Sequence, residues 1–306
     1  MALLACACDD PLNNSGVPGC TTLEGVAQKY IAVPRVSSDG TNNGVLLTDT
    51  LNQAYFDAKF NEADPTKRWY PLPLMKNIED VRAEVIRQTF NDASSVIIQE
   101  GARSVTAMVV ARSTVFLGKI KQWSCNDFDL YTVDKQKNLI GQLSTDSLYL
   151  EGIPVDKGTW YPNLVKTNDT AQQMIAFSFE WDQTAADEDI RQISAGSLGG
   201  ANLLLSDGLL DVNAVPSGIS TTGFTLTQTA DYGDVTNPIQ IEGWVIGDYT
   251  LLDDGGSPIT ITSVTETPAS SGIYVFVIPA QTSGDVLTLD ASKTGFDFPT
   301  TTVTVP

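Results

Sequence analysis

Apolar residues between positions 77 and 90 recur with the period of an α-helix. They fall at i, i+3, i+7 and i+8, on one face of such a helix, and they are Ile78, Val81, Val85 and Ile86. Asn77 suits the N-cap, because its side-chain oxygen can accept a free backbone N–H of the first turn. The pattern therefore predicts an amphipathic helix over residues 78–90.

A β-hairpin is expected directly after this helix. Residues 95–99 are rich in β-branched side chains, which favour strands, and Glu100-Gly101 can form a tight turn. Residues 103–110 carry apolar side chains on both faces of a strand, and such a strand is normally covered on both sides. We expect the helix on one face, and the domain's own sheet or a neighbouring subunit on the other.

Further strands are predicted from alternation and composition. Residues 129–133 and 138–143 flank a charged turn and predict a second hairpin, while residues 114–120 predict another strand. The clearest alternation lies in residues 174–181, where every second side chain is large and apolar. This last pattern predicts a half-buried strand with an aromatic face.

The first 76 residues show little periodicity. They are rich in Asn, Gly, Pro, Asp and Thr, and only residues 46–60 could carry a short helix. Some seventy loosely patterned residues are too many for an ordinary loop in a compact domain. We therefore predict an irregular arm over residues 1–76 that is held by neighbouring subunits.

A domain boundary is predicted at residues 194–201, which are small and flexible. Beyond it, short strands separated by turn signals are typical of a β-sandwich, with Trp244 as a core aromatic. These strands are predicted near 202–206, 222–229, 238–246, 248–252, 258–266, 272–279, 284–290 and 300–305.

The expected fold class is mainly β, with an α+β first part. The chain is predicted to comprise the arm (1–76), a β-sandwich or barrel assembly domain flanked by the helix (77–196), and a second β-sandwich (197–306). At 306 residues the chain is long enough for two separate cores.

The net charge of −19 is distributed unevenly. Residues 1–196 hold 25 acidic and 17 basic side chains, whereas residues 197–306 hold 12 acidic side chains and a single basic one, Lys293. Such a surface repels nucleic acid and anionic membranes and keeps a β-rich protein in solution. No apolar run approaches the length of a membrane span.

The sequence offers no recognisable catalytic constellation, and we expect no enzymatic activity. It contains no histidine, which excludes Ser-His-Asp and Cys-His catalysis. Residues 195–199 resemble a nucleophile elbow without a base to serve it, and Gly118-Lys119 lacks the preceding glycines of a phosphate loop. A carboxylate-based hydrolase is the remaining enzymatic reading, but no motif places a pair of carboxylates.

Neither a cofactor nor a metal is predicted, although three groups of residues are candidates. Asp187-Glu188-Asp189 could bind a hard cation or form a solvated acidic helix start, and Asp253-Asp254-Gly255-Gly256 could bind calcium or form a hairpin turn. The cysteines could bind zinc, form a disulfide or stay as free thiols; they are Cys6, Cys8, Cys20 and Cys125. Leu3-Leu4-Ala5-Cys6 looks like a lipoprotein cleavage box, but without a basic and an apolar region we expect no signal peptide.

The last hundred residues resemble bacterial immunoglobulin-like domains. The resemblance lies in SVTETPASSGIYVFVIPA at positions 263–280 and in KTGFDF at positions 293–298. It implies an immunoglobulin-like sandwich, a module that occurs in many functional contexts.

The first part resembles the major tail tube proteins of tailed bacteriophages. The resemblance rests on SSVIIQEGARSVTAMVV at positions 94–110, on FLGKIKQWSC at positions 116–125, and on the order of arm, helix, hairpin and strands. It implies a structural protein of the virion, assembled in the host bacterial cytoplasm. Its copies would form homo-oligomeric rings, expected to be hexameric, that stack around a channel and contact other virion proteins.

Other interpretations remain open at this point. They are a head or neck protein, a capsid decoration protein, and a module that binds a cell surface. In a tail tube, DNA would pass through the channel without specific binding. Because a basic lining would hold DNA by its phosphates, we expect an inner surface dominated by Asp and Glu, with the basic residues used mainly in contacts between subunits. The alternative is that the acidic residues only coat the outside.

Overall fold

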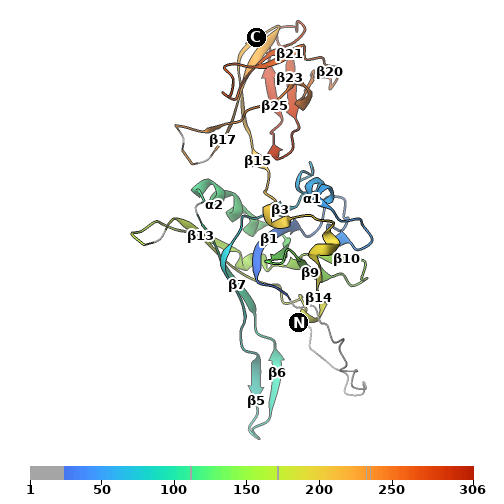
Figure 1. The fold of residues 1–306 in the computed structure, drawn as a ribbon, viewed down its shortest axis with the longest axis vertical. Coiled ribbons are helices and arrows are strands. Elements are labelled where there is room, and N and C mark those ends of the chain that lie inside the picture. Colours follow the sequence, from blue (N-terminus) through green and yellow to red (C-terminus); the bar gives the residue numbers. More distant parts are fainter. Residues whose placement is uncertain (1–23, 111, 171, 232, 235) are drawn as a thin grey trace. The chain divides into compact units, whose positions relative to one another are not determined.

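The computed structural model describes residues 24–110, 112–170, 172–231, 233–234 and 236–306. Strands predominate in these residues, which contain only two α-helices, and the predicted mainly β fold class is confirmed. The chain divides into two compact units (Figure 1), the first with described residues from 24–112 and 117–206, the second formed by 113–116 and 207–306. The main division thus falls after Ser206, ten residues beyond the predicted boundary.

The first unit contains an eight-stranded antiparallel sheet in the order β2-β10-β9-β8-β1-β3, with β11 paired to β8 and β14 paired to β9. Its strands are β1 (Ala27–Pro34), β2 (Val45–Leu46), β3 (Tyr70–Pro71), β8 (Phe128–Asp134), β9 (Leu139–Leu143), β10 (Tyr149–Glu151), β11 (Ile153–Pro154) and β14 (Ile190–Ile193). The predicted hairpin over 129–143 is confirmed, because Thr132 of β8 lies opposite Ile140 of β9.

The predicted irregular arm is wrong for its described part. Strand β1 lies between β3 and β8 within the larger sheet, and helix α1 (Gln53–Phe60) buries Phe56 and Phe60 in the core. Five consecutive residues of β1 are buried, so the strand has no alternation that a pattern search could detect. Residues 1–23 of the predicted arm lie outside the described residues.

A four-stranded antiparallel sheet completes the first unit, in the order β12-β13-β7-β4. Its strands are β4 (Lys76–Arg82), β7 (Arg103–Val110), β12 (Tyr161–Val165) and β13 (Met174–Glu180). Strand β13 alternates as predicted: Ile175, Phe177 and Phe179 are buried, and the residues between them are half-buried.

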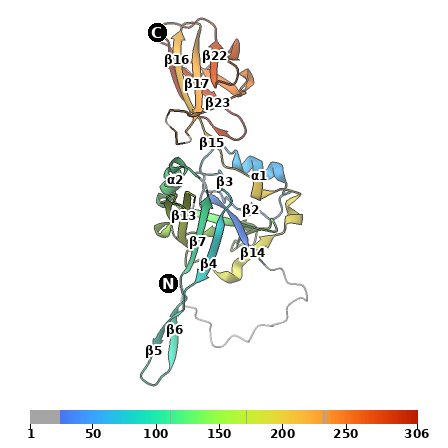
Figure 2. The ribbon, with the colours of Figure 1, turned by 60° about the vertical axis from the view of Figure 1, so that its left-hand side comes forward.

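A long hairpin replaces the predicted helix over residues 78–90. The hairpin predicted between residues 95–99 and 103–110 is also wrong, because these two segments follow one another along the same side of the long hairpin and do not pair with each other. Strand β4 pairs with β7, and then β5 (Ile86–Thr89) pairs with β6 (Ser95–Gln99) as a separate two-stranded ladder (Figure 2). Asn77 has a φ of +51° beside a register shift, so it forms a bulge and not an N-cap. The four apolar side chains of the helical pattern are β-branched and suit a strand equally well, and hydrogen bonding to β7 decides between the two.

A helix stands where a strand was predicted at residues 114–120. Helix α2 (Thr114–Lys121) buries Leu117 and Ile120, which are three residues apart on one helical face. The carbonyl of Ile120 accepts a hydrogen bond of 2.9 Å from the Trp160 indole N–H. Residues 114–120 therefore combine a strand-like composition with a helical contact face.

The second unit has two antiparallel sheets over one hydrophobic core. The first contains β16 (Asn213–Ser220), β17 (Gly223–Ala230), β22 (Ile273–Val277) and β21 (Ser263–Glu266), with β18 (Ile239–Gln240) beside β17. The second contains β20 (Pro258–Ile259), β19 (Tyr249–Leu252), β23 (Val286–Ala291) and β25 (Thr301–Thr304). A short parallel pair is formed by β15 (Leu210–Asp211) and β24 (Phe296–Asp297).

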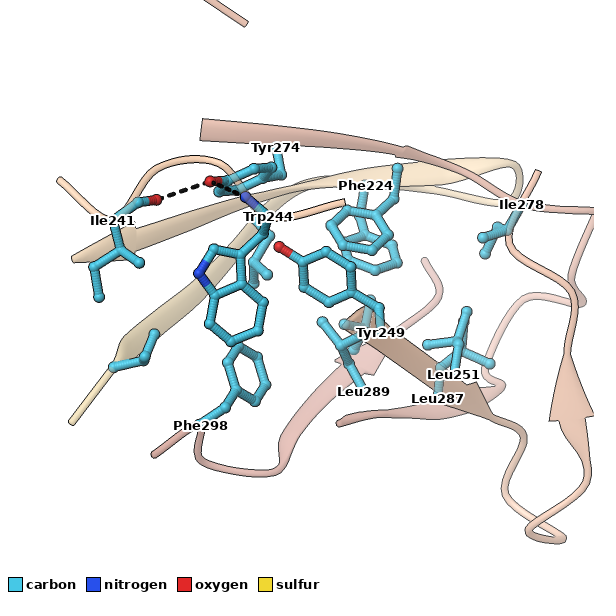
Figure 3. Packing of buried hydrophobic residues seen from close by; sticks show 14 of the residues in the cluster. Phe224, Ile241, Trp244, Tyr249, Leu251, Tyr274, Ile278, Leu287, Leu289 and Phe298 are labelled. Atoms are coloured by element: carbon cyan, nitrogen blue, oxygen red, sulfur yellow. Dashed lines mark hydrogen bonds between the residues drawn. The ribbon is translucent and has the colours of Figure 1, made fainter. Parts of the chain in front are cut away.

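Trp244 lies in the core of this unit, as predicted, and is 4% exposed. Figure 3 shows its indole beside Tyr249 and Phe298, and shows the Tyr274 hydroxyl between Trp244 and Ile241. That hydroxyl donates a hydrogen bond of 2.8 Å to the Ile241 carbonyl and lies 3.3 Å from the Trp244 backbone N–H. The polar atoms that β22 brings into the core are thus partnered by the loop that carries Trp244.

The strand predicted near 202–206 is wrong, and strand β16 was missed. Residues Leu203–Leu205 form a 3₁₀ turn, and Leu203 is fully buried in the core of the first unit. Strand β16 contains Pro216 and Gly218, which are unfavourable inside strands and hide its pattern. The other 3₁₀ turns are Gln122–Cys125, Lys157–Thr159, Asp187–Asp189, Ala195–Leu198 and Ile246–Asp248.

Candidate assembly interface

The motifs that resemble catalytic or phosphate sites have structural roles. Ser197 lies in a 3₁₀ turn with its hydroxyl 3.0 Å from that of Ser194, and the next residue, Leu198, is buried. Gly118-Lys119 lies in the middle of α2 and not in a loop that precedes a helix. Neither motif therefore has the local geometry of the site it resembles.

The two acidic motifs also have partners within the chain. Asp253 accepts hydrogen bonds from the backbone N–H groups of Gly255 and Ser257, at 2.9 and 2.7 Å, in the turn between β19 and β20. Residues 253–256 thus form a hairpin turn. Asp187 begins a 3₁₀ turn and forms ion pairs with Arg82 and Arg103. Among the described residues no cluster of three or more potential metal ligands occurs.

The cysteines divide between described and undescribed residues. Cys125 is exposed as a free thiol at the end of a 3₁₀ turn. Cys6, Cys8 and Cys20, together with the cleavage-box motif at residues 3–6, lie outside the described residues. The zinc and disulfide alternatives for these three therefore remain predictions.

The most prominent surface feature is the hairpin of β5 and β6, which we call the assembly hairpin (residues 83–102). In Figures 1 and 2 it extends well beyond the sheet from which it leaves. Apolar side chains that are 45–58% exposed lie along it and at its base: Val81, Ile86, Phe90, Val96, Ile97 and Ile98. Exposed apolar surface of this kind is a feature shared by protein–protein contact sites, membrane contact sites and ligand-binding grooves.

Both faces of the assembly hairpin carry apolar side chains. Gln88 lies opposite Val96, and Arg87 lies opposite Ile97. Successive strand residues point to opposite faces, so Val96 and Ile98 share one face while Ile97 lies on the other. An isolated two-stranded hairpin is marginally stable in water. Its faces therefore suit insertion between two surfaces better than docking on one.

An ion network holds the base of the hairpin. Arg82 contacts Glu100 at 2.7 Å and Asp187 at 2.6 Å. Arg103 forms two hydrogen bonds of 2.8 Å with Asp80 and a longer contact of 3.3 Å with Asp187. The hairpin thus projects from an anchored base, although its own side chains are solvated.

The four-stranded sheet has one covered face and two open edges. Within the described residues, β12 pairs only with β13, and β4 pairs only with β7. Ser104, Thr106 and Val110 of β7 are exposed, so the expected cover on both sides of this strand is absent from the described chain. In particular, the predicted helical cover does not exist, because the residues assigned to it form the end of β4 and the first strand of the assembly hairpin.

No model of a known protein family matches the chain, and a search of curated proteins also gives no match. Within the described part of the chain, no helix is long and apolar enough to cross a membrane.

Proposed function

We propose that this chain is a structural subunit of a tailed-bacteriophage virion, and that its copies stack as rings to form the tail tube. The observation that carries the proposal is the assembly hairpin, whose two apolar faces need cover that its own unit does not supply. Neighbouring copies would provide that cover. In this role the chain has no catalytic task, and its partners are copies of itself and other virion proteins.

The open edges of the four-stranded sheet support a ring. Edge strands present unpaired N–H and C=O groups that can pair with another chain. Pairing of β12 in one copy with β4 in the next would join different surfaces, and such head-to-tail contacts close into a ring when the rotation permits it. In a closed ring, the four-stranded sheets of all copies would have no open edge.

The exposed face of this sheet is the proposed lining of the channel. Its ionisable side chains are Lys76, Glu79 and Glu180, which lie opposite Met108, Thr106 and Ser104 of β7 on the face away from the buried residues of that strand. Duplex DNA carries about one negative charge per 1.7 Å of its axis, and a basic lining would bind it. A lining with these three groups would be weakly acidic, less so than the carboxylate-dominated surface expected from the sequence.

The second unit is the proposed immunoglobulin-like appendage. Two antiparallel sheets over a shared core support this assignment. Its surplus of acidic residues would keep the assembled particle soluble.

The proposal is tested by comparing Val96→Asp with Val275→Asp in the full chain. Both replace an exposed strand valine, the first in the assembly hairpin and the second in the appended unit. We expect wild type and Val275→Asp to form rings or tubes in electron microscopy, and Val96→Asp to stay unassembled. A wild-type protein that remains monomeric or trimeric at high concentration contradicts the tube and supports a decoration or surface-binding protein.

A further inference from the structure

One carboxylate bridges the two strands at the point where the assembly hairpin leaves its sheet. Arg82 of β4 lies opposite Arg103 of β7, and these are the last paired residues before the hairpin. Asp187 places Oδ2 at 2.6 Å from Arg82 and Oδ1 at 3.3 Å from Arg103. A single side chain therefore contacts both strands.

Asp187 comes from a different part of the first unit than its partners. Its turn connects β13 of the four-stranded sheet with β14, which pairs with β9 of the eight-stranded sheet. The other network carboxylates, Asp80 and Glu100, belong to β4 and to the hairpin itself. Only Asp187, among the network carboxylates described, ties the hairpin's base to the larger sheet.

The chain directly beyond these arginines is built as a narrow neck. Strand β4 ends at Arg82 and β5 begins at Ile86, and between them the Ala83 N–H donates to the Ala102 carbonyl. The two strands approach so closely that a Cβ on Gly101 would lie 1.9 Å from the Ala83 carbonyl oxygen. A two-stranded neck has no neighbouring strands to resist bending, so its direction depends on contacts at its base.

We infer that Asp187 is a positioning residue that fixes the direction of the assembly hairpin through Arg82 and Arg103. Its consequence for assembly rests on the proposed function, whereas its effect on the hairpin's direction does not. Arg103 is held independently by Asp80 and lies 5.8 Å from the centre of the Trp181 ring. Gln99 of β6 also donates a hydrogen bond of 2.9 Å to Gln183, which lies in the same connection as Asp187. Loss of Asp187 therefore loosens the direction of the hairpin, which this single neutral contact then holds, and leaves the sheet beneath it intact.

The direct test measures the direction of the hairpin in the full chain. Spin labels are attached to Cys125 and to a cysteine introduced by Ser94→Cys, in a chain in which Cys6, Cys8 and Cys20 are replaced by Ser. They report the distance between the body of the first unit and the tip of the hairpin. We expect a narrow distance distribution that broadens in Asp187→Asn and narrows again in Asp187→Glu. The melting temperature should stay unchanged, because Asp187 is 55% exposed and exposed ion pairs add little stability.

The control is Asp127→Asn, which removes an exposed carboxylate paired with Lys157 at 3.0 Å elsewhere in the unit. This variant should leave the distance distribution unchanged. In contrast, about 0.5 M salt should broaden the distribution of wild type more than that of Asp187→Asn, because salt screens exposed charges. An Asp187→Asn distribution as narrow as that of wild type overturns the inference.

Assembly is measured in a separate experiment, so that the positioning role of Asp187 and the proposed tail-tube function are tested independently. If wild type forms tubes, Asp187→Asn should need about threefold to tenfold more protein to do so, the factor that two lost surface ion contacts allow. Tube formation at the wild-type concentration would overturn the link between hairpin direction and assembly. If wild type does not assemble, the proposed function fails, and the distance distributions alone decide the positioning role.

Discussion

Asp129 shows how burial changes the chemistry of a single residue. It lies 2.8 Å from Arg35, and its side chain is 14% exposed. Burial raises the pKa of its carboxyl from 3.8 to about 6, and the hydrogen bond from Arg35 opposes this rise only in part. Negative charge on Glu151 and Asp182 adds to the increase.

The raised pKa of Asp129 predicts that acidification increases the stability of the folded protein, through protonation of this carboxyl. Between pH 3.8 and about 6 the folded protein binds the proton more tightly than the unfolded chain does. The contribution of Asp129 to the free energy of unfolding is therefore complete below pH 3.8 and is lost as the pH rises through about 6. At its full size, this contribution is about 3 kcal/mol. Urea unfolding at pH 7 and pH 5 should show wild type gaining stability relative to Asp129→Asn on acidification.

The matched variant for this measurement is Asp127→Asn, whose carboxylate is 57% exposed. The difference between wild type and this variant should change little over the same pH range. A loss of wild-type stability relative to Asp129→Asn on going from pH 7 to pH 5 would contradict the expected sign.

Tyr274 supports a prediction for the second unit. Its buried hydroxyl supplies a hydrogen bond to the Ile241 carbonyl and lies near the Trp244 N–H (Figure 3). Tyr274→Phe should lower the free energy of unfolding by about 1–3 kcal/mol, because it leaves these buried groups without that partner. Tyr161→Phe, at a side chain that is 61% exposed, should change it by less than about 0.5 kcal/mol.

At the scale of elements, the assembly hairpin differs from every strand that forms the cores. Its apolar side chains are exposed, so it adds little to the folding of the first unit. The edge strands of the four-stranded sheet, β4 and β12, also lack partners, because the backbone groups on their outer sides are not paired within the described chain. Under the proposed function, neighbouring copies would cover the hairpin and pair with these edges.

Replacing residues 84–99 by a short Gly-Ser turn should therefore separate folding from assembly. We expect the midpoint of thermal unfolding to stay within a few degrees of wild type, because the removed side chains contact solvent. Ring or tube formation in electron microscopy should be abolished. Tubes formed by the shortened protein would show that the hairpin is not an assembly surface.

At the scale of the whole molecule, the end of the first unit is defined by residues 198–206. Leu198, Ala201 and Leu203 are buried in the first core. The ammonium of the buried Lys29 donates to the carbonyls of Leu204 and Ser206. The run of small residues that suggested a linker therefore belongs to a folded unit.

Two truncations test this boundary. A chain ending at Ser206 should remain folded and assemble, because it keeps the whole first core. A chain ending at Gly200 should lose about 2–5 kcal/mol of stability or fail to fold, because it removes Leu203 from a fully buried position. Equal midpoints of urea unfolding for the two truncated chains would show that the first unit ends at the small residues 194–201, as predicted from the sequence.

The sequence by itself determined the elements whose pattern is local. Alternation in residues 174–181 predicted β13, the Asp253 turn follows from side-chain bonds to N–H groups two and four residues away, and Trp244 was correctly assigned to a core. The mainly β class follows for the same reason. A strand with one covered face carries its period in its own residues.

Only the tertiary structure decided the segments whose partners lie far along the chain. Residues 78–90 fit a helical and a strand pattern, and pairing of β4 with β7 selects the strand. Strand β1 is covered on both faces and shows no period, while Asp187 meets Arg82 from 105 residues away. Partners that lie far apart along the chain are brought together only by the folded structure, and the spacing of residues within one segment does not encode them.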